Sequence, residues 1–272
     1  MFPTFRLGPW ELQTYSTAYA AGLILAGMLA FLRLRQLPDP PQRHMRDVLA
    51  AIAAGLVGTY LIAVFPTAQR FIQTGELAWV SRASFIGTLA GGTLAVVLLY
   101  HRNPASLGRR LDRGGPPWAL LLVVGRIGCL GIGCCGGRIT ESALAMWLPD
   151  EAGRWAMRYP TQIMSGLANL LIFGVLLAVE RYGQKRGGKD GTWPFGGFLF
   201  CLYIGLFCLE RFSMEWLRAD ATPLWGPLSW AHLVTLAGMG AVAAVIVRGV
   251  RKARRPEAPQ RSGLPLPGLL PR

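Results

Sequence analysis

Seven apolar stretches, separated by short polar segments, occupy most of the chain. They cover roughly residues 12–32, 48–68, 83–100, 117–135, 162–180, 194–217 and 228–247. A helix needs about 20 apolar residues to cross the hydrocarbon core of a bilayer. The pattern therefore predicts an all-α polytopic membrane protein of about seven transmembrane helices. The third stretch contains Gly87, Gly91 and Gly92, and such small residues predict a close approach to a neighbouring helix.

Basic residues are concentrated in alternate connections between these stretches. Arginine and lysine are frequent at 33–46, at 102–113, at 181–189 and from Arg248 onward, whereas the intervening connections hold fewer. Loops rich in arginine and lysine stay in the cytoplasm. We therefore expect the N-terminus outside the cell and the C-terminus in the cytoplasm.

The composition fits a chain that lies mainly in lipid. Of the 272 residues, 52% are hydrophobic and 15% are charged, against about 25% charged residues in a soluble domain. In a soluble protein the net charge of +14 would favour a nucleic-acid partner. Here the basic residues belong to membrane loops, and no RNA-binding or zinc-finger spacing accompanies them. We expect no nucleic-acid partner.

The seven spans are expected to form a single transmembrane domain over residues 1–255. Residues 256–272 are rich in proline and glycine, so a disordered cytoplasmic tail is predicted. No signal-peptide cleavage site follows the first apolar stretch, which is therefore expected to stay in the mature protein.

Ionisable residues lie within two of the predicted spans. Arg126 belongs to the fourth, and Glu210, Arg211, Glu215 and Arg218 belong to the end of the sixth. Such residues are costly in a bilayer and are therefore candidates for function. As an alternative, Arg211 and Arg218 snorkel to the interface, and Glu215 pairs with one of them at helical spacing.

The expected orientation places further polar residues at the same depth. Tyr15, Ser84 and residues 159–162 begin spans that run inward, while 126–138 and 211–218 end spans that run outward. Five separate segments would thus meet near the outer leaflet. We predict a site accessible from that leaflet, where arginines hold an anion such as a lipid phosphate.

Several short motifs occur in these same segments. They are Gly125-Arg126-Ile127-Gly128 followed by Gly133 and Gly137-Arg138, then Arg158-Tyr159-Pro160-Thr161-Gln162, then Arg211, Glu215, Arg218 and Asp220, with Tyr15 and Gly91-Gly92 earlier in the chain. In this order they resemble the bacterial prolipoprotein diacylglyceryl transferases. The resemblance implies a seven-helix enzyme of the bacterial inner (cytoplasmic) membrane. Its members transfer the diacylglyceryl group of phosphatidylglycerol to the lipobox cysteine thiol of a preprolipoprotein, so the implied partners are that lipid and the precursor's signal peptide and lipobox.

The chain also departs from the pattern of that family. Ile86-Gly87-Thr88 stands where the family carries His-Gly-Gly, so the histidine is missing. Cys129 and Cys134 stand where the signature commonly has asparagine and glutamate. An alternative function is therefore that of a non-catalytic or differently specific lipid-binding relative.

The resemblance also implies roles for individual residues. Arg126 and Arg211 are expected to hold the lipid phosphate and to stabilise the charge of the departing group. The remaining substrate-binding candidates are Gly137, Arg138, Tyr159, Gln162 and Arg218. Because the thiol must lose its proton, Glu215 or a relay through Tyr15 is the candidate base. Glu215 alternatively orients Arg211. No cofactor is expected.

Three cysteines lie close together in the sequence at 129, 134 and 135. Cys134 and Cys129 are candidates for a thiol role, either in a disulfide or in a covalent intermediate. The alternative is that they only pack as small residues. No metal site is predicted, because His44, His101 and His232 are expected to lie elsewhere.

Overall fold

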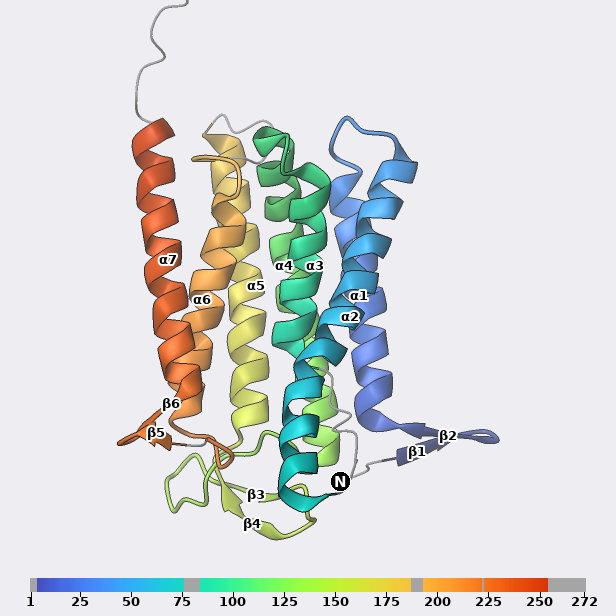
Figure 1. The fold of residues 1–272 in the computed structure, drawn as a ribbon, viewed down its shortest axis with the longest axis vertical. Coiled ribbons are helices and arrows are strands. Elements are labelled where there is room, and N and C mark those ends of the chain that lie inside the picture. The colour runs from blue at the N-terminus through green and yellow to red at the C-terminus, as the bar shows by residue number, and fades with distance from the viewer. Residues whose placement is uncertain (1–3, 76–83, 187–192, 222, 254–272) are drawn as a thin grey trace, which may run out of the picture.

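The computed structural model describes residues 4–75, 84–186, 193–221 and 223–253, and these residues form a bundle of seven helices (Figure 1). The helices lie side by side along the longest axis of the molecule. Their bounds are α1 Thr14–Leu34, α2 Pro41–Thr74, α3 Phe85–Tyr100, α4 Pro104–Ile132, α5 Thr161–Lys185, α6 Phe198–Glu215 and α7 Trp230–Ala253. The predicted tail at 256–272 and part of the basic 181–189 connection lie outside the described residues.

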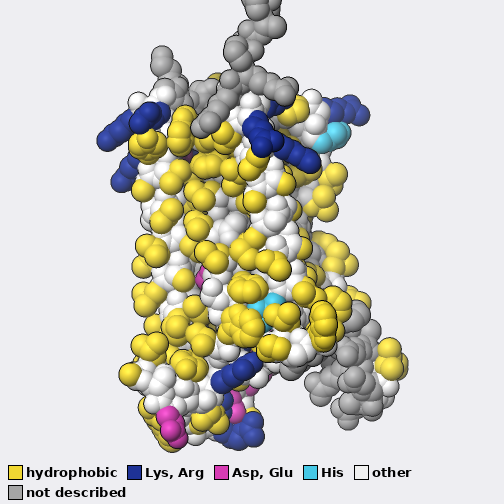
Figure 2. Space-filling view, turned by 90° about the vertical axis from the view of Figure 1, so that its left-hand side faces the viewer, with side chains coloured by type: hydrophobic (Ala, Val, Ile, Leu, Met, Phe, Trp, Pro, Cys, Tyr) yellow, Lys and Arg dark blue, Asp and Glu magenta, His cyan; other side chains and the backbone are white. Residues whose placement is uncertain are grey.

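Five of these helices are long and apolar enough to cross a membrane, which confirms a helical membrane protein. They are α1, α4, α5, α7 and the Pro41–Ile62 part of α2. Helix α3 has only 16 residues, and α6 contains Glu210, Arg211 and Glu215 within its 18. Large hydrophobic side chains cover the middle of the outer surface, as expected of a face that meets lipid (Figure 2).

Three two-stranded hairpins lie together at one end of the bundle (Figure 1). They pair β1 Thr4–Leu7 with β2 Trp10–Gln13, β3 Met146–Pro149 with β4 Trp155–Arg158, and β5 Pro223–Trp225 with β6 Leu228–Ser229. The expectation of an all-α chain omitted them, because strands of two to four residues leave almost no periodic pattern. Trp10, Trp147 and Trp225 are exposed on them, as is typical of side chains at a membrane interface. We call this end the hairpin end.

Glycines allow α2 and α3 to pack backbone against backbone. A Cβ atom on Gly91 would lie 2.1 Å from the Ala54 carbonyl oxygen, and one on Gly87 would lie 2.4 Å from the Gly58 carbonyl oxygen. A Cβ atom on Gly92 would lie 2.8 Å from the Trp118 ring of α4. The close approach predicted from these three glycines is confirmed.

The opposite end of the bundle is fastened by buried ion pairs. Glu180 of α5 binds Arg33 at 2.9 Å and Arg113 at 2.8 Å. Arg110 binds Asp47 at 2.9 Å and Asp39 at 2.7 Å. Interpreting Arg33, Arg110 and Arg113 as plain loop charges was therefore wrong, since all three are buried. Two of them lie inside α4, which begins at Pro104 and not near residue 117.

Candidate functional site

A tight loop follows α4 at the hairpin end and carries the second half of the glycine-rich motif. Gly133 has φ +75° and Cys135 has φ +57°, so the chain turns sharply as soon as the helix ends. The start of α5 holds this loop by two side chains. Gln162 Nε2 donates to the Cys134 carbonyl at 2.9 Å, and Thr161 Oγ1 donates to the Cys135 carbonyl at 2.8 Å. The loop is therefore fixed in place by the Pro-Thr-Gln segment that the sequence singled out.

The same loop also binds the segment that follows α6. Arg138 N donates to the Leu217 carbonyl at 2.8 Å, and Ala219 N donates to the Gly136 carbonyl at 3.0 Å. Arg138 Nε donates to the Arg218 carbonyl at 3.0 Å. On the other side Gly137 N donates to the Tyr159 carbonyl at 3.2 Å. Three motifs that are far apart in the sequence thus form one connected structure.

Gly137 is required by its contact with Tyr159. A Cβ atom at this position would lie 2.4 Å from the Tyr159 carbonyl oxygen, closer than any side chain allows. The Tyr159 hydroxyl interacts with Thr140 and Ser142, whose hydrogen bonds lower its pKa. Gly137 and the backbone of Tyr159 therefore hold the loop, while the tyrosine hydroxyl faces the connection between α4 and α5.

Three arginines from different elements converge beside this loop. Arg211 lies in α6. Arg126 of α4 and Arg218, just after α6, both lie close enough to it for their positive charges to repel that of Arg211. Arg211 forms an ion pair with Glu215 at 2.5 Å, and Arg218 binds Asp220 through two nitrogens at 2.8 and 2.5 Å. Within the described residues the buried Nε of Arg126 has no hydrogen-bond partner. Three guanidinium groups face two carboxylates, so the site carries excess positive charge and can hold an anion.

Glu215 is joined to the start of α7 by a short hydrogen-bond chain. Ser229 Oγ donates to Glu215 Oε1 at 2.7 Å and lies 3.2 Å from His232 Nδ1. His232 is buried, with its ring 4.4 Å from that of Trp216. His232 was expected to lie away from the three cysteines; it contacts Ser229, the hydrogen-bond partner of Glu215. Its one sequence signal is the Ser229-x-x-His232 spacing at the start of a helix, where a side chain can accept from a free backbone N–H.

The three neighbouring thiols gather at the base of the loop. The sulfur atoms of Cys129, Cys134 and Cys135 all lie within 4.8 Å of one another, and each thiol is free. The Arg218 side chain lies close enough to Cys135 to interact with it electrostatically. Hydrogen bonds from the Cys129 and Cys134 thiols lower the pKa of Cys135, and the charges of Arg218 and Arg126 lower it further. Cys135 was not among the predicted site residues.

Tyr15 borders the thiols and connects them to α3. It lies close enough to all three sulfurs to interact with them electrostatically, and its ring stacks on that of Tyr19. The Tyr19 hydroxyl hydrogen-bonds Thr88, which in turn lies 2.6 Å from the Thr59 hydroxyl. Thr88 belongs to the segment in which the resemblance expects a histidine, while Ile86 itself is exposed on the outer surface.

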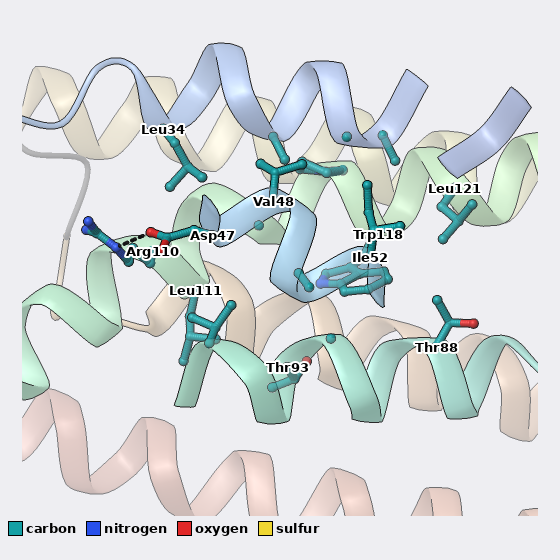
Figure 3. A pocket seen from close by; sticks show the side chains of 18 of the residues that line it. Leu34, Asp47, Val48, Ile52, Thr88, Thr93, Arg110, Leu111, Trp118 and Leu121 are labelled. Atoms are coloured by element: carbon teal, nitrogen blue, oxygen red, sulfur yellow. Dashed lines mark hydrogen bonds and ion pairs between the residues drawn. The ribbon is translucent and has the colours of Figure 1, made fainter. Parts of the chain in front are cut away.

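An apolar pocket begins near Thr88 and runs between helices α1 to α4 (Figure 3). Val48, Ile52, Trp118 and Leu121 line its length, and the Asp47–Arg110 ion pair lies at its other end. Glycine and alanine at several lining positions keep the channel open. Such a pocket suits a hydrocarbon chain, since its walls carry few hydrogen-bonding groups.

The fold and the site together define an integral membrane protein with a cluster of arginines at one end of a helical bundle. A family model described as prolipoprotein diacylglyceryl transferase matches residues 3–248. The chain therefore belongs to the prolipoprotein diacylglyceryl transferase family.

Relatives from several bacteria match along most of their length. The phosphatidylglycerol–prolipoprotein diacylglyceryl transferase of Gloeobacter violaceus is 30% identical over 93% of this chain and 94% of its own. The enzyme numbered 2 in Clostridium perfringens is 25% identical, over 83% and 86% respectively. The Pseudomonas paraeruginosa protein of the same name is 26% identical, over 84% and 83%.

Proposed function

We propose that this protein transfers the diacylglyceryl group of phosphatidylglycerol to the lipobox cysteine of a preprolipoprotein. The observation that carries the proposal is the convergence of Arg126, Arg211 and Arg218 at one end of the helical bundle, where no described residue hydrogen-bonds Arg126 Nε. Family membership supplies the reaction class. The geometry supports a held phosphate diester, because planar guanidinium groups match phosphate oxygens and stay charged at low dielectric.

All seven helices cross the bacterial inner membrane in this proposal, with the hairpin end outside. The N-terminus is then outside and the C-terminus cytoplasmic, and residues 1–255 form one domain followed by a cytoplasmic tail. Figure 2 shows lysine and arginine side chains at both ends of this face. The orientation is supported by the sequence, because the segments that connect or follow the helices at the end opposite the hairpins are the richer in lysine and arginine. Helices α3 and α6 are included because both pack within the bundle.

The arginines act on the phosphate in both the ground state and the transition state. As the carbon–oxygen bond of the diacylglyceryl group breaks, negative charge builds on the departing glycerol phosphate. Arg126 and Arg211 stabilise that charge, and Arg218 is the third cation within reach of the head group. Gln162 and Arg138 position the loop beside it. Gly137 and Tyr159 contribute through their backbone contact.

Glu215 acts in this scheme as a positioning residue. Both of its carboxylate oxygens are engaged, one by Arg211 and the other by Ser229. A carboxylate held on both sides in this way fixes the orientation of its arginine. Tyr15, next to the thiols, is the residue whose hydroxyl contacts the incoming cysteine in this scheme. The pocket between α1 and α4 receives an acyl chain of the lipid.

The test is transfer of a labelled diacylglyceryl group to a lipobox peptide, together with rescue of a strain depleted of its own transferase. Wild type should rescue, while Arg126→Ala and Arg211→Ala should lose activity by about 100-fold or more, the effect of removing one transition-state donor. Arg102→Ala, which changes an exposed arginine at the opposite end, is the matched control and should behave as wild type.

Two results would contradict the proposal. If well-expressed wild type neither rescues nor transfers, the lipid-binding alternative is favoured. If the arginine variants are as active as wild type, the arginines do not hold the phosphate.

A further inference from the structure

The cysteine cluster has the composition of a metal site and needs no histidine. Cys129 lies in the last turn of α4, and Cys134 and Cys135 lie in the loop that follows. Their three sulfur atoms are within 4.8 Å of one another. Three thiolates around a tetrahedral zinc ion, with bonds of about 2.3 Å, lie about 3.8 Å apart. Small rotations about the side-chain bonds would close that difference.

The backbone of the loop is built to bring these sulfurs together. Cys134 N donates to the Cys129 carbonyl at 3.1 Å, which closes the turn between the first two thiols. Cys135 adopts φ +57°, the only positive φ at a non-glycine residue among those described. That conformation costs a side chain about 1–2 kcal/mol, and the contacts to Thr161 and Gln162 hold it. A strained residue whose side chain joins two other thiols indicates a site and not simple packing.

The surroundings also match the charge that such a site would carry. Three thiolates and one zinc ion have a net charge of −1, and an added fourth thiolate makes it −2. Arg126 and Arg218 both lie close enough to Cys135 for their positive charges to act on it. Cys129 and Cys134 are buried whereas Cys135 is partly exposed, so the cluster is reached from the Cys135 side. A fourth ligand can therefore enter from there.

We propose that Cys129, Cys134 and Cys135 bind a zinc ion whose fourth position takes the thiol of the incoming lipobox cysteine. The inference rests on the proposed function, since it names the group that activates the nucleophile in that reaction. Catalytic zinc sites commonly have three protein ligands and one open position, and a thiol that binds zinc loses its proton. The metal would thus replace the histidine that is missing at Ile86.

The proposed step is a substitution at carbon. The lipobox thiol releases its proton to water as its sulfur binds zinc. That sulfur then attacks the glyceryl carbon of the diacylglycerol and forms a carbon–sulfur bond. The carbon–oxygen bond to the phosphate breaks, and its electron pair leaves with glycerol phosphate, which Arg126 and Arg211 hold. No electrons are exchanged with an outside oxidant or reductant.

The first experiment measures metal binding without reference to activity. Purified full-length protein in detergent is stripped with a chelator, reloaded with Zn²⁺ or Co²⁺, and its metal content and Co²⁺ absorption are recorded. Wild type should bind zinc stoichiometrically and give the intense visible bands of tetrahedral cobalt with thiolate ligands. Cys134→Ser and Cys135→Gly should lose both signals. Cys208→Ser, which changes a buried cysteine of α6 outside the cluster, should retain them.

The Cys135→Gly variant distinguishes loss of a metal ligand from loss of the fold. Glycine adopts a positive φ without strain, so this variant should be as stable as wild type while lacking one ligand. If this variant unfolds at the same temperature as wild type but binds no metal, the missing thiol and not misfolding explains the loss. Equal metal binding by wild type and by both cluster variants would overturn the zinc site.

The second experiment connects the metal to the reaction. A lipobox peptide should change the Co²⁺ spectrum, and the same peptide with serine in place of cysteine should not. Removing zinc should slow transfer about 30-fold at pH 7, because only about 3% of a free thiol with a pKa near 8.5 is ionised. Adding Zn²⁺ should restore it. Transfer unaffected by chelation or by Cys135→Gly would overturn the zinc proposal and leave the proposed function standing. Thiol-dependent zinc binding with no transfer under any condition would overturn the proposed function instead.

Discussion

Glu215 shows how one carboxylate can serve a site without touching the reacting atoms. Its two oxygens contact Arg211 and Ser229, and Ser229 reaches His232. Losing this carboxylate would leave Arg211 free to swing away from the phosphate. We therefore expect the loss of Glu215 to affect the reaction through the position of Arg211.

The substitution Glu215→Gln distinguishes a residue that positions Arg211 from a general base. Glutamine still accepts a hydrogen bond from Ser229 but loses the ion pair with Arg211, so we expect a loss of about tenfold, mainly as a higher KM for phosphatidylglycerol. Steady-state kinetics of diacylglyceryl transfer give the comparison, with the exposed Glu141→Gln as control. If Glu215 were the general base, the variant would instead lose about 100-fold or more in kcat at unchanged KM. That result would refute the positioning role.

At this scale the sequence predicted the arginines better than their partners. Arg126 and Arg211 stand out because a charge within an apolar span is costly. The link from Glu215 to His232 joins α6 to α7 through Ser229, and no spacing within either helix encodes it. Cys135 was noted beside Cys134 but given no role of its own, because its position in the cluster depends on a backbone angle.

At the scale of elements, the α2–α3 pair depends on glycine more than on apolar side chains. The backbones approach so closely that Gly58, Gly87 and Gly91 each face a carbonyl oxygen or Cα atom of the other helix. Close packing of this kind takes the place of hydrophobic association, which lipid cannot drive. The pair forms one wall of the apolar pocket.

Gly91→Ala should therefore destabilise the protein, because the added Cβ would lie 2.1 Å from the Ala54 oxygen. We expect a loss of about 1–3 kcal/mol, typical of overpacking, measured as a lower unfolding temperature in detergent. Gly240→Ala in α7 is the matched control, since nothing lies within 4 Å of its Cβ position. It should be neutral or slightly stabilising. Equal changes in stability at the two positions would show that helix propensity, and not contact with α2, determines the effect of the substitution.

The helices could be predicted from hydropathy, but several of their ends and all of the hairpins could not. Helix α4 extends back to Pro104 because Arg110 and Arg113 are paired with carboxylates in the bundle. A hydropathy pattern counts these arginines as loop residues. The hairpins are too short for a period of two to appear, and their pairing is decided by the turns that join them.

At the scale of the whole molecule, the two ends of the bundle differ in how their arginines are paired with carboxylates. At the end opposite the hairpins, buried arginines are matched by Glu180, Asp47 and Asp39. At the hairpin end, Arg211 pairs with Glu215 and Arg218 pairs with Asp220, whereas Arg126 Nε has no partner in the described part of the chain. The first arrangement fastens the bundle, whereas the second leaves charge available to an anion.

Glu180→Ala tests the fastening role. It would leave Arg33 and Arg113 buried without their carboxylate, and breaking a buried pair costs about 3–5 kcal/mol. We expect a markedly lower unfolding temperature, with transfer activity retained below it because the site lies at the other end. The exposed neighbour Arg181→Ala should have little effect. Unchanged stability of Glu180→Ala would mean that the ion pairs contribute nothing to the bundle.

The orientation of the molecule in the membrane decides whether the proposed reaction can occur at all. We expect a fluorescent protein fused to the C-terminus to fluoresce, as it does in the cytoplasm. Alkaline phosphatase inserted at the exposed turn near Gly153, between β3 and β4, should be active, as it is outside the inner membrane. The exchanged pair, with phosphatase at the C-terminus and fluorescent protein at the turn, should give neither signal. The opposite pattern would place the arginines and the three thiols on the cytoplasmic side, and a lipobox cysteine presented from the outer leaflet would then never reach them.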